Sequence, residues 1–439
     1  MRLEILLIAV ALGLSGVSGA FAAELVAKSG ERPLQEVLDA AEDGDTVRVT
    51  EGIYRGNFTI PRSIELVGEP GAVLDGENQG RVLTLTAPQT TVRDLHLKRD
   101  GADLTDIDAV IFVEKTATGS LIKNNRIEAR GFGIWLDGVA DARVIDNRIS
   151  GDTSLRSQDR GNGLHLFNVT GAEIVDNEVW NARDGIYIDV SNHNRLIGNL
   201  LRDQRYGVHY MFSQHNVVRD NVTRNNRLGY ALMQSRHLEV VGNRSYRDQN
   251  YGFLMNFIVD STFIGNVSLE AQRGVSPGTV VKADGHAISG AEGKALFVYN
   301  SLFNEIRDNL FANTEIGIHL TAGSEDNEFH SNAFVGNQTQ VKYVAIRQQE
   351  WSHEGRGNYW SDYLGWDLDG DGIGDIPYEP NDSVDRLVWT YPMAKILMNS
   401  PAVQVLRWVQ REFPVLRPPG VKDSHPLMTL PDGMAEILQ

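Results

Sequence analysis

The stretches GIYIDVSNHNRLIGNLL (185–201) and GVHYMFSQHNVVRDNVT (207–223) are consecutive copies of one repeat. Each copy opens with a glycine and a short alternating segment, and each closes on an asparagine that follows three residues after an apolar one. Further copies place this asparagine at positions 125, 147, 177, 199, 221, 243, 266, 309 and 332. The usual step is therefore 22 or 23 residues, and a fixed period of this length is typical of a solenoid.

The repeat favours short strands over helices. Apolar and polar residues alternate within each segment, which indicates β-strands, and the period is too short for a helical hairpin. We therefore predict an all-β protein that winds as a single-stranded, right-handed parallel β-helix. Its coils would stack about 4.8 Å apart, so that equivalent repeat positions form columns. Asparagines in such a column can ladder their amides from coil to coil.

Departures from the period set the expected domain organisation. Residues 33–42, PLQEVLDAAE, predict a helical cap on the first coil. One long step adds residues around GDTSLRSQDRG (151–161), and another contains an insertion at 273–293. We expect an N-terminal cap at 23–44, the β-helix at 45–345, a C-terminal extension at 346–392 and a tail at 393–439.

Composition and the first residues indicate an exported protein. The apolar run ILLIAVALGL (5–14) and the AFA sequence (20–22) predict that residues 1–22 are a secretory signal peptide. The 439 residues carry a net charge of -17, so nucleic acid is not an expected partner. No cysteine is present, which excludes disulfides and means that any soft-metal site must use methionine and histidine.

Alternation after each glycine separates inward from outward side chains. The first and third residues after the glycine are apolar and should fill the core, whereas the second and fourth should point outward. The first outward column is Trp135, His165, Tyr187, His209, Ala231, Leu254, Phe297 and His319, and the second is Asp137, Phe167, Asp189, Met211, Met233, Asn256, Tyr299 and Thr321. Histidine and methionine are unexpected on a merely solvated sheet face.

These columns predict a copper site. Met211 and Met233 share a column in adjacent coils, next to His209, and thioether plus imidazole without thiolate favours Cu(I). The predicted ligands are His209, Met211 and Met233, with His215, Asp189 and His286 of the insertion as additional candidates. The alternative is that the two methionines only pack beneath the insertion.

Two further features need separate interpretations. Met255 is displaced by one position through a 23-residue step, so it should point into the core. His193, His215 and His237 form another column, in the turn after the glycine segment. Stacked imidazoles there could replace an asparagine ladder, which is the structural alternative to a metal site.

The C-terminal part carries an acidic loop and an apolar segment. The loop contains Asp367, Asp369, Asp371 and Asp375, an arrangement that can converge on Ca²⁺, although Tyr378 stands where an EF-hand has its last glutamate. An acidic turn without metal is the alternative. The tail 393–439 includes an uncharged apolar run, which is expected either to cap the solenoid or to dock on a membrane partner.

Three classes of function fit a solenoid of this kind. A copper-handling protein would use the histidine and methionine face. A polysaccharide lyase or hydrolase would need paired carboxylates or a basic residue on an outward sheet, but Asp137 and Asp189 lie two coils apart with Phe167 between them, and neither column contains lysine or arginine. A structural or adhesive solenoid would not require such a face.

The opening GDTVRVTEGIYRGNFTI (44–60), the repeats quoted above and the closing motif GNYWSDYLGWDLDGDGIGDIPY (357–378) resemble the NosD family over residues 24–392. The resemblance implies a periplasmic protein that works with the membrane subunit of an ABC transporter and a copper chaperone. It also implies delivery of copper, sulfur or both to nitrous oxide reductase apoprotein for assembly of its copper–sulfide centre. No family motif identifies the ligands, so the copper site rests on the columns.

Overall fold

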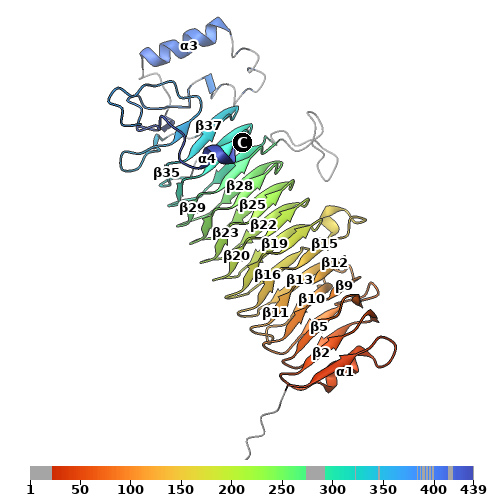
Figure 1. Cartoon of the computed structure of the whole chain (residues 1–439). Coiled ribbons are helices and arrows are strands. Elements are labelled where there is room, and N and C mark those ends of the chain that lie inside the picture. The colour runs from red at the N-terminus through yellow and green to blue at the C-terminus, as the bar shows by residue number, and fades with distance from the viewer. Residues whose placement is uncertain are drawn as a thin grey trace, which may run out of the picture.

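The computed structural model describes residues 22–272, 292–321, 323–344, 347–382, 384–385, 387, 391, 394, 397, 400–413 and 419–438. The predicted signal peptide up to residue 21 and insertion residues 273–291, including His286, lie outside the described residues. The described chain forms one long stack of parallel strands, seen along its length in Figure 1. This architecture confirms the prediction of an all-β parallel β-helix.

Each coil contributes one strand to each of three parallel sheets, here named A, B and C. Sheet A contains, in spatial order, β1 (Glu24–Ala27), β2 (Thr46–Val49), β5 (Glu65–Gly68), β8 (Thr91–Arg93), β11 (Leu121–Lys123), β14 (Arg143–Ile145), β17 (Glu173–Val175), β20 (Arg195–Ile197), β23 (Val217–Arg219), β26 (Glu239–Val241), β29 (Thr262–Ile264), β32 (Glu305–Arg307) and β35 (Glu328–His330). Sheet B contains β3 (Gly52–Arg55), β6 (Ala72–Asp75), β9 (His96–Lys98), β12 (Arg126–Ala129), β15 (Arg148–Gly151), β18 (Glu178–Trp180), β21 (Leu200–Arg202), β24 (Val222–Arg224), β27 (Arg244–Tyr246), β30 (Val267–Leu269), β33 (Leu310–Ala312), β36 (Ala333–Val335) and β39 (Tyr359–Trp360).

Sheet C is built from the segments that follow the repeat glycines. It contains β4 (Phe58–Ile60), β7 (Leu83–Leu85), β10 (Ala109–Val113), β13 (Phe132–Asp137), β16 (Leu164–Phe167), β19 (Asp184–Asp189), β22 (Tyr206–Met211), β25 (Leu228–Met233), β28 (Tyr251–Asn256), β31 (Lys294–Tyr299), β34 (Ile316–Thr321) and β37 (Thr339–Val344). The first and third residues after the glycines fill the core: Val208 and Tyr210 of β22 are fully buried. Met255 is 1% exposed, which confirms its predicted inward position.

The repeated asparagines form a buried ladder, which we call the asparagine ladder: Asn125, Asn147, Asn177, Asn199, Asn221, Asn243, Asn266, Asn309, Asn332 and Asn358. Asn221 is typical, since its Oδ1 accepts from both the backbone N–H and Nδ2 of Asn199, at 3.0 and 2.8 Å. Its own Nδ2 donates to the carbonyl of Leu196 at 2.9 Å. The left-handed backbone falls on the residue before the asparagine, as at Asp220 with φ of 54°.

Both ends of the stack are capped. The parallel strands also extend beyond the expected limits of 45–345 at each end. The helix α1 (Leu34–Ala40) buries Leu34, Val37 and Leu38 against the first coils, as the predicted helical cap requires. Strand β1 pairs with β2 before residue 45, and β39 pairs with β36 after residue 345.

The C-terminal tail expected at 393–439 divides into two parts in the described residues. Helix α3 (Pro401–Glu412) stands apart from the stack in Figure 1, with Val405, Leu406 and Trp408 exposed. Residues 419–438 instead return to the solenoid, where β40 (Val421–Lys422) pairs with β38 (Gln349–Glu350). Asp423 is fully buried and ends the asparagine ladder by accepting from the backbone N–H of Asn358 at 2.7 Å.

The remaining helices are short. The 3-10 helix η1 (Ser157–Asp159) lies in the first long step, and α4 (Met434–Ile437) brings Met434 against the outer side of sheet B. Among the described helices, none has the length and apolarity that crossing a membrane requires.

Candidate metal site

From Trp135 to His209, the first outward column of sheet C is a continuous stack of rings. Register pairs Trp135 with His165, His165 with Tyr187, and Tyr187 with His209 in successive coils. The ring centroids lie 3.8, 4.7 and 4.6 Å apart, respectively. These side chains therefore shield one another, and the outward histidines are largely buried although they belong to the surface of the solenoid: His165 is 6% and His209 9% exposed.

His209 is held by a buried carboxylate. Its Nδ1 lies 3.0 Å from Oδ2 of Asp184, which belongs to the preceding coil and is fully buried. Arg205 binds the same carboxylate through two nitrogens, with Nε at 2.7 Å from Oδ1. Burial alone would raise the pKa of Asp184, but the hydrogen bonds from His209 and Arg205 outweigh it and lower this pKa below its ordinary value. Tyr206 packs edge-on against His209, with centroids 5.0 Å apart.

The two methionines lie beside this histidine. Met211 pairs with Asp189 of the preceding coil, and Met233 pairs with Asn256 of the following one, so both occupy the second outward column. Tyr210 pairs with Leu232, which sets Met211 and Met233 in equivalent positions of adjacent strands. Adjacent strands are about 4.8 Å apart. The structure therefore brings the side chains of His209, Met211 and Met233 to one region of sheet C.

An apolar patch borders the methionines. Leu228, Ala231 and Leu254 are buried on the outer face of sheet C, and Met233 packs against them together with Tyr206. Such surroundings limit water and favour a soft, weakly hydrated ion over a hard one.

The additional candidate ligands fall in different places. Asp189 is half-buried in the column of Met211, and burial raises the pKa of its carboxyl. His215 lies beyond the turn, exposed, and its ring stacks between those of His193 and His237, with centroids 5.1 and 4.7 Å apart. Two nitrogens on one ion lie at most about 4.2 Å apart, so face-to-face rings at this spacing favour the structural interpretation of the histidine column.

Sequence reasoning missed the residue that precedes each glycine. Asp184 and Tyr206 occupy this position and contact His209, although simple alternation would direct them inward. The pattern breaks because the glycine lies tightly against the neighbouring coil: a Cβ on Gly185 would lie 2.6 Å from the carbonyl oxygen of Gly207. The signal was available as a third column, with Phe132, Asn162, Asp184, Tyr206, Leu228, Tyr251 and Ile316 before the glycines and Lys294 before Ala295, which takes the place of a glycine.

The acidic loop forms a cluster remote in sequence from this face. Asp367, Asp369 and Asp371 each offer a carboxylate oxygen, and these oxygens lie within 4.8 Å of one another. The charge of Asp371 raises the pKa of Asp369. Asp375 is not part of this group of three, and its Oδ2 accepts from the backbone N–H of Leu368 at 2.7 Å.

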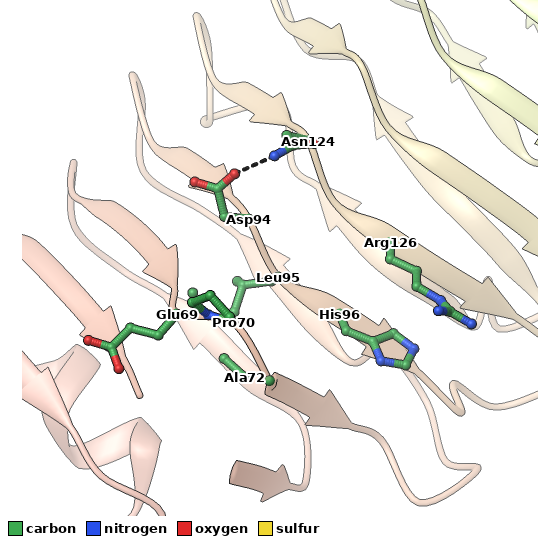
Figure 2. A pocket seen from close by; sticks show the side chains of 10 residues that line it. Glu69, Pro70, Ala72, Asp94, Leu95, His96, Asn124 and Arg126 are labelled. Carbon is green, nitrogen blue, oxygen red and sulfur yellow. Dashed lines mark hydrogen bonds between the residues drawn. The ribbon is translucent and has the colours of Figure 1, made fainter. Parts of the chain in front are cut away.

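A groove of about 490 Å³ opens near the first coils and is shown in Figure 2. One polar pair in it is already bonded, since Asn124 donates to Asp94 at 2.6 Å. Nε2 of His96 lies 3.2 Å from the carboxylate of Glu128 but has no hydrogen-bond partner among the described residues. Arg126 lies beside His96 on the adjacent strand. The groove lies several coils away from His209 and offers no converging set of soft ligands.

Comparison with known proteins identifies the family of this chain. A family model described as "Periplasmic copper-binding protein (NosD)" matches residues 145–365. A Pseudomonas aeruginosa protein named "Probable ABC transporter binding protein NosD" is 57% identical over 395 residues, which are 90% of this chain and 91% of that protein. A protein of the same name from Stutzerimonas stutzeri is 58% identical over 384 residues, with 88% and 87% covered.

Among solved structures, a PL6 alginate lyase in complex with a trisaccharide is similar with a TM-score of 0.51. The match covers 75% of this chain and 85% of the lyase at 13% identity, which shows the fold alone. The two relatives that share more than half of their residues with this chain carry the family assignment. The chain therefore belongs to the NosD family of periplasmic copper-binding proteins.

Proposed function

We propose that this protein binds one Cu(I) through His209, Met211 and Met233 and passes it on for assembly of the copper–sulfide centre of nitrous oxide reductase. The observation that supports the proposal is the register of sheet C, in which these three residues occupy outward positions of two adjacent strands. Thioether and imidazole ligands suit Cu(I). Since no thiolate is present, affinity should stay moderate, as a protein that releases its cargo requires.

The chain acts, in this proposal, in the periplasm after removal of the predicted signal peptide at 1–22. Its partners are a copper chaperone that supplies the ion, the membrane subunit of an ABC transporter and nitrous oxide reductase apoprotein. The transporter is supported by the name of the two relatives, and the other partners by the family resemblance. In this proposal, a sulfur species accompanies copper only if the transporter exports one.

Helix α3 is the segment we assign to the transporter. Ser400 caps the helix by accepting from the backbone N–H of Val403, and Pro401 is its first residue, both of which favour a helix start at this point. The exposed side chains of Val405, Leu406 and Trp408 offer an apolar surface to a membrane-embedded partner.

Deleting 393–439 would not test this docking cleanly, because it would remove the buried Asp423 and β40. Replacing Leu406 and Trp408 by serine leaves residues 419–438 in place and should weaken copurification of the transporter at least tenfold. Equal copurification by the folded double variant would contradict the assignment. The matched control is serine at Leu364 and Leu368, which are also exposed but lie outside α3.

We infer a binding protein rather than a carbohydrate-active enzyme. Asp137 pairs with Phe167, and Phe167 with Asp189, so a phenyl ring separates the two outward carboxylates of the second column. Arg205, a basic residue at this face, is bound bidentately to Asp184. Release of unsaturated or reducing sugars from alginate or pectate by the purified protein would favour the enzyme instead.

Competitive Cu(I) titration against a chromophoric chelator tests the copper site. The double variant Met211→Leu and Met233→Leu keeps volume and apolarity, so its melting temperature should change little. We expect at least a tenfold loss of Cu(I) affinity. The matched control is Met255→Leu, the same substitution at the inward position, which should bind as wild type does. Equal affinity in the double variant would overturn the proposed ligands.

We also propose that Asp367, Asp369 and Asp371 bind Ca²⁺ in a structural role. Three carboxylate oxygens within 4.8 Å suit a hard cation. Calcium should raise the melting temperature of wild type and leave that of Asp369→Asn with Asp371→Asn unchanged. No calcium-dependent shift in wild type would identify an acidic turn without metal.

A further inference from the structure

Two histidines of the first outward column have opposite hydrogen-bond partners. His165 faces Asn162 through Nδ1 at 3.1 Å, and His209 faces Asp184 through Nδ1 at 3.0 Å. Asn162 and Asp184 are equivalent in the repeat, because each directly precedes a repeat glycine of sheet C. The two histidines therefore differ in chemistry although they lie two coils apart in one column.

The partner of His209 leaves Nε2 as the ligand atom. A carboxylate can only accept a hydrogen bond, so the proton of this contact resides on Nδ1 of His209. The lone pair of the neutral ring then lies on Nε2. Among the described residues, Nε2 of His209 has no hydrogen-bond partner, and it is not among the buried unpartnered atoms. It is thus open to an incoming ion.

The hydrogen-bond partner of His165 leaves the proton on Nε2 instead. Arg183 donates from Nε to Oδ1 of Asn162 at 3.2 Å, which directs the amide Nδ2 toward His165. An amide nitrogen can only donate, so Nδ1 of His165 accepts and Nε2 carries the proton. In the described part of the chain this Nε2 is buried and has no partner. His165 therefore presents no lone pair to a metal.

We propose that Asp184 is a positioning residue that selects His209 as the copper-binding histidine of the column by fixing its Nδ1–H tautomer, and that Asn162 excludes His165 by fixing the opposite one. This inference rests on the proposed copper function and deepens it. Metal-binding histidines commonly donate their other nitrogen to a carboxylate, which orients the ring and increases ligand basicity. In this protein, the residue before the repeat glycine determines which histidine is oriented in this way.

Arg205 completes the arrangement around Asp184. Its two nitrogens bind both carboxylate oxygens, and its guanidinium lies 4.4 Å from the centre of the Tyr206 ring. Such a bidentate contact holds the carboxylate plane in one orientation. Arg183 holds Asn162 in a similar way one coil earlier, so the two arginines are matched supports for the two different acceptors.

The isosteric exchange Asp184→Asn tests the proposal in the full-length protein. The amide that replaces this carboxylate would accept from Nε of Arg205 through its oxygen and donate to His209 through its nitrogen, as Asn162 does in its own coil. Nη2 of Arg205 loses its acceptor, but the arginine side chain is 30% exposed and can turn this nitrogen to water, so folding should survive. Long-range ¹H–¹⁵N correlation of ¹⁵N-histidine-labelled apoprotein at pH 8 reports which ring nitrogen carries the proton. A His209→Gln variant identifies the His209 signals.

We expect the protonated nitrogen of His209 to change from Nδ1 to Nε2 in Asp184→Asn, and Cu(I) affinity to fall about 10–100-fold. Asn162→Asp is the matched control: it should move the proton of His165 to Nδ1 and leave the tautomer of His209 as in wild type. Unchanged Cu(I) affinity in Asp184→Asn, with a proven tautomer change and strong loss in His209→Gln, would overturn the positioning role.

The proposed function fails separately. If His209→Gln binds Cu(I) as wild type does, the copper site is elsewhere, whatever the tautomers are. If His209 already carries its proton on Nε2 in wild type, the positioning proposal is wrong even when His209 proves to be a ligand.

Discussion

The asparagine ladder and the outer face of sheet C are built from the same repeat but treat their polar atoms differently. In the ladder each amide is buried and bonded to the coils on either side, as Asn221 is to Asn199 and Asn243. On the outer face of sheet C, Nε1 of Trp135, Nε2 of His165 and Nδ1 of His319 are buried without partners among the described residues.

We infer from this contrast that one column of the repeat, the asparagine ladder, serves stability and that the outer face of sheet C serves function. A buried polar atom without a partner costs free energy, so a repeat that has satisfied one column has no structural reason to leave another unsatisfied. The outer face also carries His209, Met211 and Met233, whose ligand atoms suit a soft ion. We therefore expect substitutions in the ladder to change stability, and substitutions on the outer face to change copper binding.

The largest effect is expected from Asn221→Ala in the middle of the ladder. It removes the acceptor of the backbone N–H of Asn199 and the donor to the carbonyl of Leu196. Nδ2 of Asn199 loses one bond but still donates to the carbonyls of Ile174 and Ile197. We expect the free energy of unfolding to fall by about 3–5 kcal/mol. Calorimetry measures the change, and Cu(I) affinity of the folded variant should stay unchanged. If Asn221→Ala were as stable as wild type, the claim that the asparagine ladder stabilises the fold would be wrong.

A smaller effect, a gain in stability, is expected at Asp248, where an acid occupies a position that a neutral amide could fill. Asp248 is buried and accepts from Asn226, and burial raises the pKa of its carboxyl to about 6. The folded state therefore retains a proton that the unfolded state loses above about pH 4. This contribution stabilises the fold at low pH and is lost as the pH rises through about 6.

Asp248→Asn should remove that loss. We expect Asp248→Asn to have a higher melting temperature than wild type at pH 7.5 and the same melting temperature at pH 4. The gain in the free energy of unfolding at pH 7.5 should be at most about 3 kcal/mol. Thr223 and Ser245, which donate to the carboxylate, can rotate their hydroxyls to accept from the new amide. A variant less stable than wild type at pH 7.5 would show that the charged form is the favoured one.

The smallest effect is expected from the exposed histidine stack. Replacing His215 by alanine removes two ring contacts at the surface, so stability should change by less than about 0.5 kcal/mol. Cu(I) affinity should also be unchanged. A clear loss of affinity would assign the ion to His193, His215 and His237 instead of the sheet C face.

Features that recur with the period could be predicted from the sequence. The parallel fold, the ladder and the inward position of Met255 follow from local alternation, which one coil shares with the next. The role of Asp184 could not, because the close approach of Gly185 to Gly207 breaks the alternation just before each strand. The return of residues 419–438 was also missed, since Asp423 meets Asn358 and Trp360 through contacts that no repeat encodes.

The most direct test of the copper site is X-ray absorption at the copper K edge on the Cu(I)-loaded, full-length protein. The proposed ligands predict sulfur together with nitrogen around the metal. In the variant with both Met211 and Met233 replaced by leucine, the sulfur contribution should disappear. Only nitrogen and oxygen neighbours in wild type, or sulfur that persists in the double variant, would contradict the site on sheet C.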